Sequence, residues 1–216
     1  MSSNRWLIRS DRGEHRCWWC GADPLYVAYH DDEWGRPTLP DAPDDIRLFE
    51  KLCLEGFQAG LSWLTILRKR PAFREVFHGF DPHRVARMSS RDVTRLLHDS
   101  RIVRHRGKIE STINNARRAI EIIEREGSLA RRLWSFAPPM DRRPPHRTGE
   151  TIPPSTPESK ALSKALRQAG WTFVGPTTMY AFMQAVGMVN DHLVGCVRHD
   201  RVEVERRRFV SRSATA

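Results

Sequence analysis

Hydrophobic residues recur every three or four positions along most of this chain, which is the spacing of one face of an α-helix. Residues 44–55 and 107–126 show the pattern most clearly, the second over the longest run in the sequence. Strict alternation of hydrophobic and polar positions, which would indicate half-buried strands, does not extend over any long stretch. The pattern therefore predicts an all-α fold with many short helices.

Glycine and proline mark the points where the helical pattern is interrupted. Gly56 and Gly60 break it directly after residue 55, and the Ser62 hydroxyl is placed to cap a short helix that follows. Pro71 is expected to begin another helix, because proline is tolerated in a first turn and disrupts a helix interior. We therefore expect a turn after residue 55 and two separate helices beyond it.

Composition divides the chain into one domain with two polar ends. Residues 1–13 are expected to be a disordered extension, and residues 197–216, with six arginines and few hydrophobic residues, a disordered basic tail. Residues 14–196 between them are long enough for a single globular domain with a substantial core. Within this domain, residues 137–157 hold seven of the fourteen prolines and are expected to form a loop.

The charge of the chain indicates a polyanionic partner. Its formal net charge of +10 suits nucleic acid, although a solvated basic surface would give the same total. The sequence has no run of eighteen apolar residues and no secretory signal, so we expect a cytoplasmic protein without membrane spans. In that compartment the four cysteines are expected to be metal ligands or buried thiols rather than disulfides.

Cysteine and histidine spacing predicts a metal site. Cys17 and Cys20 are separated by two residues and His192 and Cys196 by three, and thiolate and imidazole are ligands that zinc favours. Spacing alone favours a site made of these four residues. A second set replaces Cys20 by His30. Either set supplies four protein ligands, which is typical of a closed, structural zinc site.

Glu55 is the candidate residue for recognition of a charged ligand. A lone glutamate at a helix end is most often exposed to solvent. If Glu55 instead faces a pocket lined by Trp19, Tyr29 and Trp63, it would place a negative charge inside an aromatic cage. Such a cage suits a flat cationic ligand through stacking and cation–π attraction. The sequence leaves both possibilities open.

Three segments could contact a polyanion such as DNA. Gly60 and Leu61 could present an apolar wedge to DNA bases, although Leu61 could equally cover the core. The hairpin at 173–177 could bind phosphate through backbone N–H groups, although such hairpins are common in helical bundles. The basic cluster at 104–108 lies at the start of the longest predicted helix and could also contact phosphate.

Several long motifs in the chain resemble one family, the DNA-3-methyladenine glycosylases I. The motifs are DPLYVAYHDDEWG (23–35), LEGFQAGLSW (54–63), RHRGKI (104–109), FVG (173–175) and FMQAVGMVNDH (182–192). They run in order over about five-sixths of the chain, from Arg16 to Cys196. Cys20 and Phe57 depart from the family pattern, and Trp19 matches the aromatic residue that follows the first cysteine.

The resemblance implies a helix-hairpin-helix DNA glycosylase fold in which one structural Zn²⁺ joins the N- and C-terminal segments. The zinc ligands map to Cys17, His30, His192 and Cys196. The base-binding residues map to Glu55, Tyr29 and Trp63, with Trp19 and Trp34 nearby. The expected DNA contacts are Gln58, Gly60, Leu61, Lys108, Val174, Gly175 and Thr177.

The implied activity is hydrolytic excision of 3-methyladenine, flipped out of alkylated double-stranded DNA by a monomeric enzyme, leaving an abasic site. The hairpin segment 173–187 contains no lysine, so we expect no Schiff-base nucleophile and no strand cleavage. Asp191 lies where relatives in the wider superfamily carry a catalytic aspartate, but the zinc-ligand motif surrounds it, so it is not assigned as the base.

Two alternative functions compete with this interpretation. One is a non-catalytic DNA-binding protein that a structural zinc ion holds together. The other is a hydrolytic zinc site that uses His30 and Glu33, which is disfavoured because four protein ligands leave no position for water.

Overall fold

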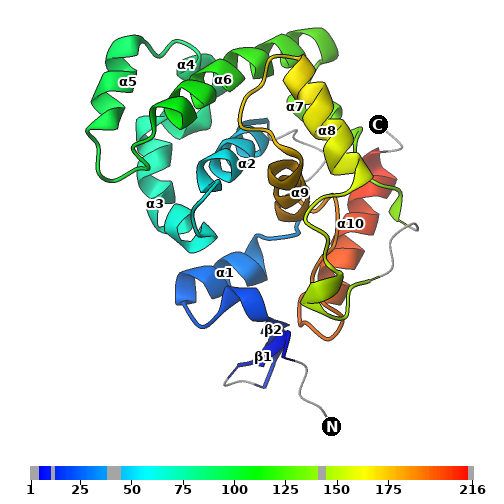
Figure 1. Cartoon of the computed structure of the whole chain (residues 1–216). Coiled ribbons are helices and arrows are strands. Elements are labelled where there is room, and N and C mark those ends of the chain that lie inside the picture. Colours follow the sequence, from blue (N-terminus) through cyan, green and yellow to red (C-terminus); the bar gives the residue numbers. More distant parts are fainter. Residues whose placement is uncertain (1–4, 11–12, 38–44, 141–144, 214–216) are drawn as a thin grey trace.

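The computed structural model describes residues 5–10, 13–37, 45–140 and 145–213 (Figure 1). Helices dominate the described residues, which confirms the predicted fold class. The elements are β1 (Leu7–Arg9), β2 (His15–Cys17), η1 (Trp18–Cys20), α1 (Pro24–Asp32), α2 (Asp45–Gln58), α3 (Trp63–Val76), η2 (His78–Phe80), α4 (Pro82–Val85), α5 (Ser90–Leu97), α6 (Arg106–Glu126), α7 (Leu129–Trp134), η4 (Gly149–Thr151), α8 (Pro157–Gln168), α9 (Pro176–Ala185) and α10 (His199–Ser213).

Helix α2 lies at the centre of the molecule, in contact with α3, α6, α7 and α9 (Figure 1). Every residue from Leu48 to Phe57 is buried, so this helix has no solvent-facing side over three turns. The ring of Phe57 lies 4.5 Å from that of Phe73 on α3, centroid to centroid. Because α2 is covered all round, its polar side chains, Glu55 among them, lie inside the protein.

Side-chain caps fix where the helices around Glu55 begin. Asp23 accepts hydrogen bonds from the backbone N–H groups of Leu25 and Tyr26, and Pro24 occupies the first position of α1. The Ser62 hydroxyl caps α3 as predicted, by accepting a hydrogen bond from the Thr65 N–H at 3.2 Å. These caps set the starting points of two of the helices that line the cavity described below.

Helix α3 runs unbroken through Pro71, where the sequence predicts the start of a separate helix. A proline inside a helix removes one backbone hydrogen bond and costs about 3 kcal/mol. Ile66 and Leu67 before it and Phe73 and Val76 after it are all buried in the core. Packing on both sides of Pro71 therefore outweighs the local preference.

The N-terminal segment is not a disordered extension over its described residues. Leu7–Arg9 forms β1, which pairs antiparallel with β2 so that Leu7 lies opposite Cys17. The Trp6 carbonyl accepts a hydrogen bond from the Trp18 N–H, and the two indoles pack with centroids 4.6 Å apart. Residues 1–4 and 11–12 lie outside the described residues. The prediction did not anticipate that Trp6 and Leu7 pack against the rest of the domain.

Over its described residues, the C-terminal segment is largely a helix, α10, and not a disordered tail. Within α10, Val202 is fully buried, and the Arg206 guanidinium donates hydrogen bonds to the carbonyls of Gly187 and Met188 at 2.7 and 2.8 Å. The prediction of disorder was wrong because it counted arginines as surface charge. Arg206 instead points inward and satisfies carbonyls at the end of α9.

Replacing Arg206 by leucine is expected to lower the free energy of unfolding by about 2–3 kcal/mol, because two buried carbonyls lose charged donors. Arg207, the next residue, has a side chain that is 73% exposed and pairs only with Glu203 among its described contacts. Arg207→Leu is the matched control, and it should change stability by less than about 0.5 kcal/mol. Urea denaturation of both variants measures the difference. Equal effects would show that α10 is not held by Arg206.

Candidate active site and metal centre

A cavity of about 300 Å³ opens where η1, α1, α2, α3 and α9 meet. Its lining is mostly aromatic, which is typical of a site for a flat organic ligand. The lining residues are Trp18, Trp19, Tyr26, Tyr29, Trp34, Glu55, Gln58, Trp63, Gly149, Ile152, Ala181 and Gln184. All five residues predicted to bind a base, Glu55, Tyr29, Trp63, Trp19 and Trp34, therefore line one cavity.

The aromatic walls are held by contacts between rings. Trp19 packs against Tyr26 and Trp34, with centroids 5.2 and 4.8 Å away, and Tyr29 lies 5.4 Å from Trp63. Tyr26 and Tyr29 are three residues apart on α1 and so share one face of that helix. This packing leaves little freedom for the rings to close into the cavity when it is empty.

Glu55 provides a buried carboxyl group in this aromatic cavity. It lies on the last turn of α2, with only 5% of the residue exposed. The exposed helix-end alternative is therefore wrong. Burial raises the pKa of Glu55 to about 8, although the ammonium of Lys51 acts to lower it. The carboxyl thus titrates near physiological pH, which is typical of functional carboxyl groups.

Gln184 completes one wall with Asp191 behind it, and sequence reasoning did not assign either residue to the pocket. Asp191 is buried and accepts hydrogen bonds from the Tyr180 hydroxyl and from Nε2 of Gln184, the latter at 2.7 Å. The Gln184 nitrogen is thereby committed to Asp191, and its amide oxygen is the end that can accept a hydrogen bond from a ligand. Asp191 therefore fixes the position of the Gln184 side chain in the cavity wall.

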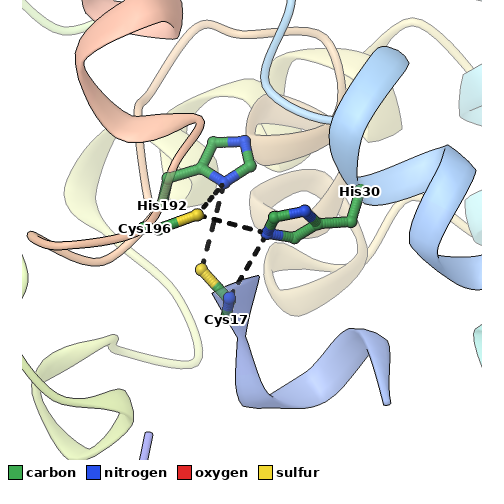
Figure 2. A group of neighbouring side chains, drawn as sticks. All are labelled: Cys17, His30, His192 and Cys196. Carbon is green, nitrogen blue, oxygen red and sulfur yellow. Dashed lines mark hydrogen bonds between the residues drawn. The ribbon is translucent and has the colours of Figure 1, made fainter. Parts of the chain in front are cut away.

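The two cysteines and two histidines of the second ligand set form a buried cluster (Figure 2). Cys17 comes from β2, His30 from α1, and His192 and Cys196 from the segment between α9 and α10. The four ligand atoms lie within 4.8 Å of one another. Sγ of Cys196 is 3.5 Å from Nε2 of His30 and 3.5 Å from Nδ1 of His192.

This donor set fits a tetrahedral metal ion. Ligands at zinc distances lie roughly 3.3–3.8 Å apart along the edges of a tetrahedron, close to the separations that the cluster already has. Glu33, the carboxylate of the hydrolytic alternative, instead pairs with Lys51 and Arg70. The cluster therefore has the composition and geometry of a closed, structural site.

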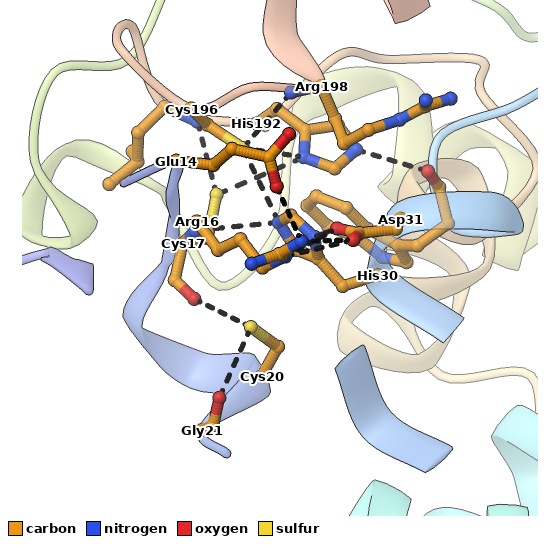
Figure 3. Close-up of polar contacts among 12 residues, drawn as sticks. Glu14, Arg16, Cys17, Cys20, Gly21, His30, Asp31, His192, Cys196 and Arg198 are labelled. Atoms are coloured by element: carbon orange, nitrogen blue, oxygen red, sulfur yellow. Dashed lines mark hydrogen bonds and ion pairs between the residues drawn. The ribbon is translucent and has the colours of Figure 1, made fainter. Parts of the chain in front are cut away.

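Polar neighbours orient the two histidines for ligation (Figure 3). Nδ1 of His30 lies 2.8 Å from the Asp31 carboxylate, which Arg16 binds in turn with its Nε. Nε2 of His192 lies 3.1 Å from the carbonyl oxygen of Trp34. These contacts leave the opposite ring nitrogen of each histidine facing the cluster, the arrangement found around metal-bound imidazoles.

The two thiols of the cluster influence one another. A hydrogen bond between them lowers the pKa of Cys196 and raises the pKa of Cys17. Zinc binds cysteine as the thiolate, so binding of a divalent cation would release a thiol proton. Cys20 is turned away, with Sγ 3.1 Å from the Cys17 carbonyl oxygen. The ligand set favoured by spacing alone is therefore wrong.

The turn between α2 and α3 carries the predicted wedge. Leu61 is 41% exposed, and Gly60 has a φ of +81°, a left-handed conformation that favours glycine. Lys108 is buried, and its Nζ donates hydrogen bonds to the carbonyls of Phe57 and Ala59 at 2.9 and 2.6 Å. Lys108 therefore holds the turn that presents Leu61. This corrects the prediction that Lys108 contacts phosphate.

The hairpin between α8 and α9 contains the remaining predicted DNA contacts. Thr177 is exposed and Gly175 is half-buried at the start of α9. Val174 is buried, and its carbonyl accepts a hydrogen bond from the Ser163 hydroxyl at 2.6 Å. Gln58 lines the cavity together with Glu55. Of these residues, Gly175 and Thr177 lie where a phosphate could approach the N-terminus of α9.

Comparison with known proteins identifies the family. The methyladenine glycosylase family profile matches residues 19–199. The DNA-3-methyladenine glycosylase 1 of Escherichia coli is 50% identical over 181 residues, which cover 84% of this chain and 95% of that protein. The DNA-3-methyladenine glycosylase of Haemophilus influenzae is 44% identical, over 84% of this chain and 96% of that one. The chain belongs to the 3-methyladenine DNA glycosylase I family.

Solved structures of this family share the fold. A crystal structure of 3-methyladenine DNA glycosylase I matches with a TM-score of 0.78 and 50% identity, over 85% of this chain and 99% of that chain. A glycosylase I variant in complex with 3-methyladenine matches with a TM-score of 0.79 and 36% identity, over 85% and 97% of the two chains. The family assignment confirms the predicted resemblance and replaces the non-catalytic alternative.

The described part of this glycosylase contains no helix that is both long enough and apolar enough to span a bilayer.

Proposed function

We propose that this DNA-3-methyladenine glycosylase binds the flipped-out base in the aromatic cavity, with Glu55 against the cationic ring, Trp63 stacked on it and Tyr29 at its edge. The supporting observation is a buried carboxyl group enclosed by indole and phenol rings in a cavity of about 300 Å³. Unmodified purines in DNA are neutral, whereas a purine methylated at N3 is cationic. A buried negative charge therefore selects the damaged base.

The chemistry follows from the same charge. The positive charge on the base weakens the bond between N9 and C1′ of deoxyribose. When this bond breaks, N9 takes the electron pair and the base leaves as a neutral molecule. Water adds to C1′ and loses a proton, which gives an abasic site. Glu55 and the rings hold the departing base in place and exclude competing water from it.

The protonation of Glu55 sets a pH requirement. With a pKa of about 8 in the empty cavity, Glu55 is ionised only at higher pH, and only the ionised form attracts a cationic base. We therefore expect kcat/KM, which reports the free enzyme, to rise with pH through about 8. Once the cationic base is bound, its charge favours the ionised carboxylate and the proton is released.

Duplex DNA is the proposed substrate form, because the site has the parts needed to extract a base. Leu61 is proposed to enter the space that the flipped base vacates, on the turn held by Lys108. The α8–α9 hairpin is proposed to bind a phosphate without reading sequence. One chain supplies every residue of the cavity, so the enzyme is proposed to act as a monomer.

The reaction is proposed to stop at base removal. No lysine is present among the described residues that line the cavity, and a Schiff-base nucleophile needs such an amine. Cys17, His30, His192 and Cys196 are proposed to hold one Zn²⁺, whose role is structural because four protein ligands complete its coordination.

Product analysis tests the proposal directly. Methylated duplex DNA is incubated with the enzyme, released bases are separated by chromatography, and the DNA is resolved on a denaturing gel before and after hot alkali. We expect free 3-methyladenine and breaks that appear only after alkali. Breaks without alkali would show a lyase activity and contradict the hydrolytic mechanism. Release of unmodified adenine at the same rate would contradict selection by charge.

A further inference from the structure

A second charged group lies directly behind the wall of the base cavity. Lys51 is on α2, one turn before Glu55, and only 2% of it is exposed. Its Nζ lies 4.5 Å from the centroid of the Tyr29 ring and 5.7 Å from that of the Trp63 ring. Tyr29 and Trp63 both line the base cavity, whereas Lys51 lines a neighbouring cavity of about 400 Å³ that Tyr29 separates from it. The ammonium therefore supports the two rings from behind.

The charges around Lys51 balance only when Glu55 is counted. Glu33, at the end of α1, pairs with the Lys51 ammonium and also accepts hydrogen bonds from the Arg70 guanidinium of α3 at 2.7 and 2.8 Å. Although burial opposes it, the two cations lower the pKa of Glu33 to about 2, so Glu33 is ionised. One anion thus faces two cations. Glu55, once ionised, supplies a second negative charge to this buried group.

Three titratable side chains among the described residues interact with the charge of Glu55. Lys51 comes from its own helix, and Tyr26 and Tyr29 face it from α1. Burial raises the pKa values of both tyrosines, so they remain neutral over the working range and contribute hydrogen bonding and ring faces. Lys51 is therefore the one cation among these neighbours that stabilises the ionised form of Glu55.

We propose that Lys51 is a positioning residue for base recognition: its buried ammonium favours the ionised form of Glu55 and holds the Tyr29 and Trp63 rings against the bound base. This inference rests on the role proposed above for Glu55. It assigns a function to a lysine that never touches the substrate, since Tyr29 and Trp63 stand between them. If Lys51 served only as the partner of Glu33, replacing it would leave the pKa of Glu55 unchanged.

The test compares the pH dependence of kcat/KM for 3-methyladenine release by the parent enzyme, Lys51→Met and Lys51→Arg. Lys51 and Glu55 are four residues apart on α2, which makes them neighbours on the helix surface, and the Lys51 charge acts to lower the pKa of Glu55. An opposite charge within about 4–6 Å changes a carboxyl pKa by roughly 1–3 units. Lys51→Met is therefore expected to move the rising limb of the profile upward by at least about one pH unit. Activity at pH 7 should then fall about tenfold or more, and recover at higher pH. Lys51→Arg keeps the charge and is expected to keep the parental limb.

Arg74→Met is the matched control. Arg74 lines the same neighbouring cavity and pairs with Glu50, and its loss removes the same formal charge. If the loss of a positive charge only weakens DNA binding in general, Arg74→Met should lower kcat/KM by the same factor at every pH. The pH at which kcat/KM rises should then stay at the parental value. Thermal melting of each variant shows that it is folded at the assay temperature. A Lys51→Met profile that keeps its limb, or an equal loss of activity at every pH, would overturn the proposal.

The double variant Lys51→Met/Glu55→Gln separates this inference from the function on which it rests. If Glu55 binds the base and Lys51 acts through it, Glu55→Gln abolishes the rise of kcat/KM with pH. The double variant should then have the same pH profile as Glu55→Gln alone. If Glu55→Gln keeps the parental activity and profile, the proposed role of Glu55 fails. If Glu55→Gln is impaired as expected while Lys51→Met keeps the parental limb, the role of Lys51 alone fails.

Discussion

Replacing Glu55 by glutamine is expected to lower kcat/KM for 3-methyladenine release by roughly 10²–10³-fold, about 3–4 kcal/mol of transition-state stabilisation. Glutamine has the same shape and fills the same space, but it cannot carry the negative charge that attracts the cationic base. The enzyme should retain its affinity for undamaged DNA, because the proposed phosphate contacts lie on the α8–α9 hairpin and not in the cavity. Base release under single-turnover conditions measures the loss.

The same substitution should leave the protein at least as stable as the parent. Burial raises the pKa of Glu55 to about 8, so the folded state favours the protonated form. In the unfolded chain a glutamate has a pKa of about 4.3. As pH rises above that value, ionisation of the unfolded chain increasingly favours unfolding, until the folded carboxyl also ionises at about pH 8. Glutamine removes this penalty, and thermal melting at pH 7.5 should show it.

Glu121→Gln is the control for both measurements. Its side chain on α6 is 53% exposed and pairs with Arg118, remote from the cavity lining. Its activity and melting temperature should match those of the parent. Parental activity in Glu55→Gln would contradict the assignment of Glu55. A large loss of stability in that variant would indicate that Glu55 has a structural role.

Loss of the proposed zinc ion is expected to have the largest effect on stability. Structural zinc contributes about 10–16 kcal/mol in small zinc-binding peptides, which is comparable to the whole stability of a typical domain, about 5–15 kcal/mol. Here the cluster joins Cys17 of β2 to His192 and Cys196 near α10. Cys196→Ser is therefore expected to lose zinc and to melt at least about 10 °C lower than the parent.

Cys20→Ser is the matched control, because Cys20 is buried beside the cluster and its thiol only contacts the carbonyls of Cys17 and Gly21. A serine hydroxyl can make the same contacts. Elemental analysis of the purified proteins should give one zinc per chain for the parent and for Cys20→Ser, and less than one for Cys196→Ser. Full zinc content in Cys196→Ser, or zinc loss in Cys20→Ser, would contradict the proposed ligand set.

Sequence periodicity was sufficient for the fold class but not for the contents of α2. Ten consecutive residues of this helix are buried, so polar residues such as Lys51 and Glu55 do not fall on a solvent-facing stripe. A charged residue in an amphipathic pattern is normally assigned to the surface. Periodicity alone therefore could not reveal the buried pair.

The candidate site, like the fold, could be predicted from the sequence only in part. Trp19, Tyr29, Glu55 and Trp63 lie on four different elements, and only the family resemblance indicated that they meet. Spacing identified two cysteines and a histidine near a metal but chose Cys20 wrongly, because local spacing carries no information about which side chains turn inward. The cavity wall formed by Gln184 through Asp191 depends on tertiary contacts that have no sequence signal.

The burial of the four cysteines has a consequence for an enzyme that works on methylated DNA. Their exposed fractions are 0, 0, 4 and 6% for Cys17, Cys20, Cys53 and Cys196. The electrophiles that methylate purines also attack thiolates, which are the strongest nucleophiles among protein side chains. Because all four thiols are buried, we expect the repair enzyme to resist inactivation by the same agents that create its substrate.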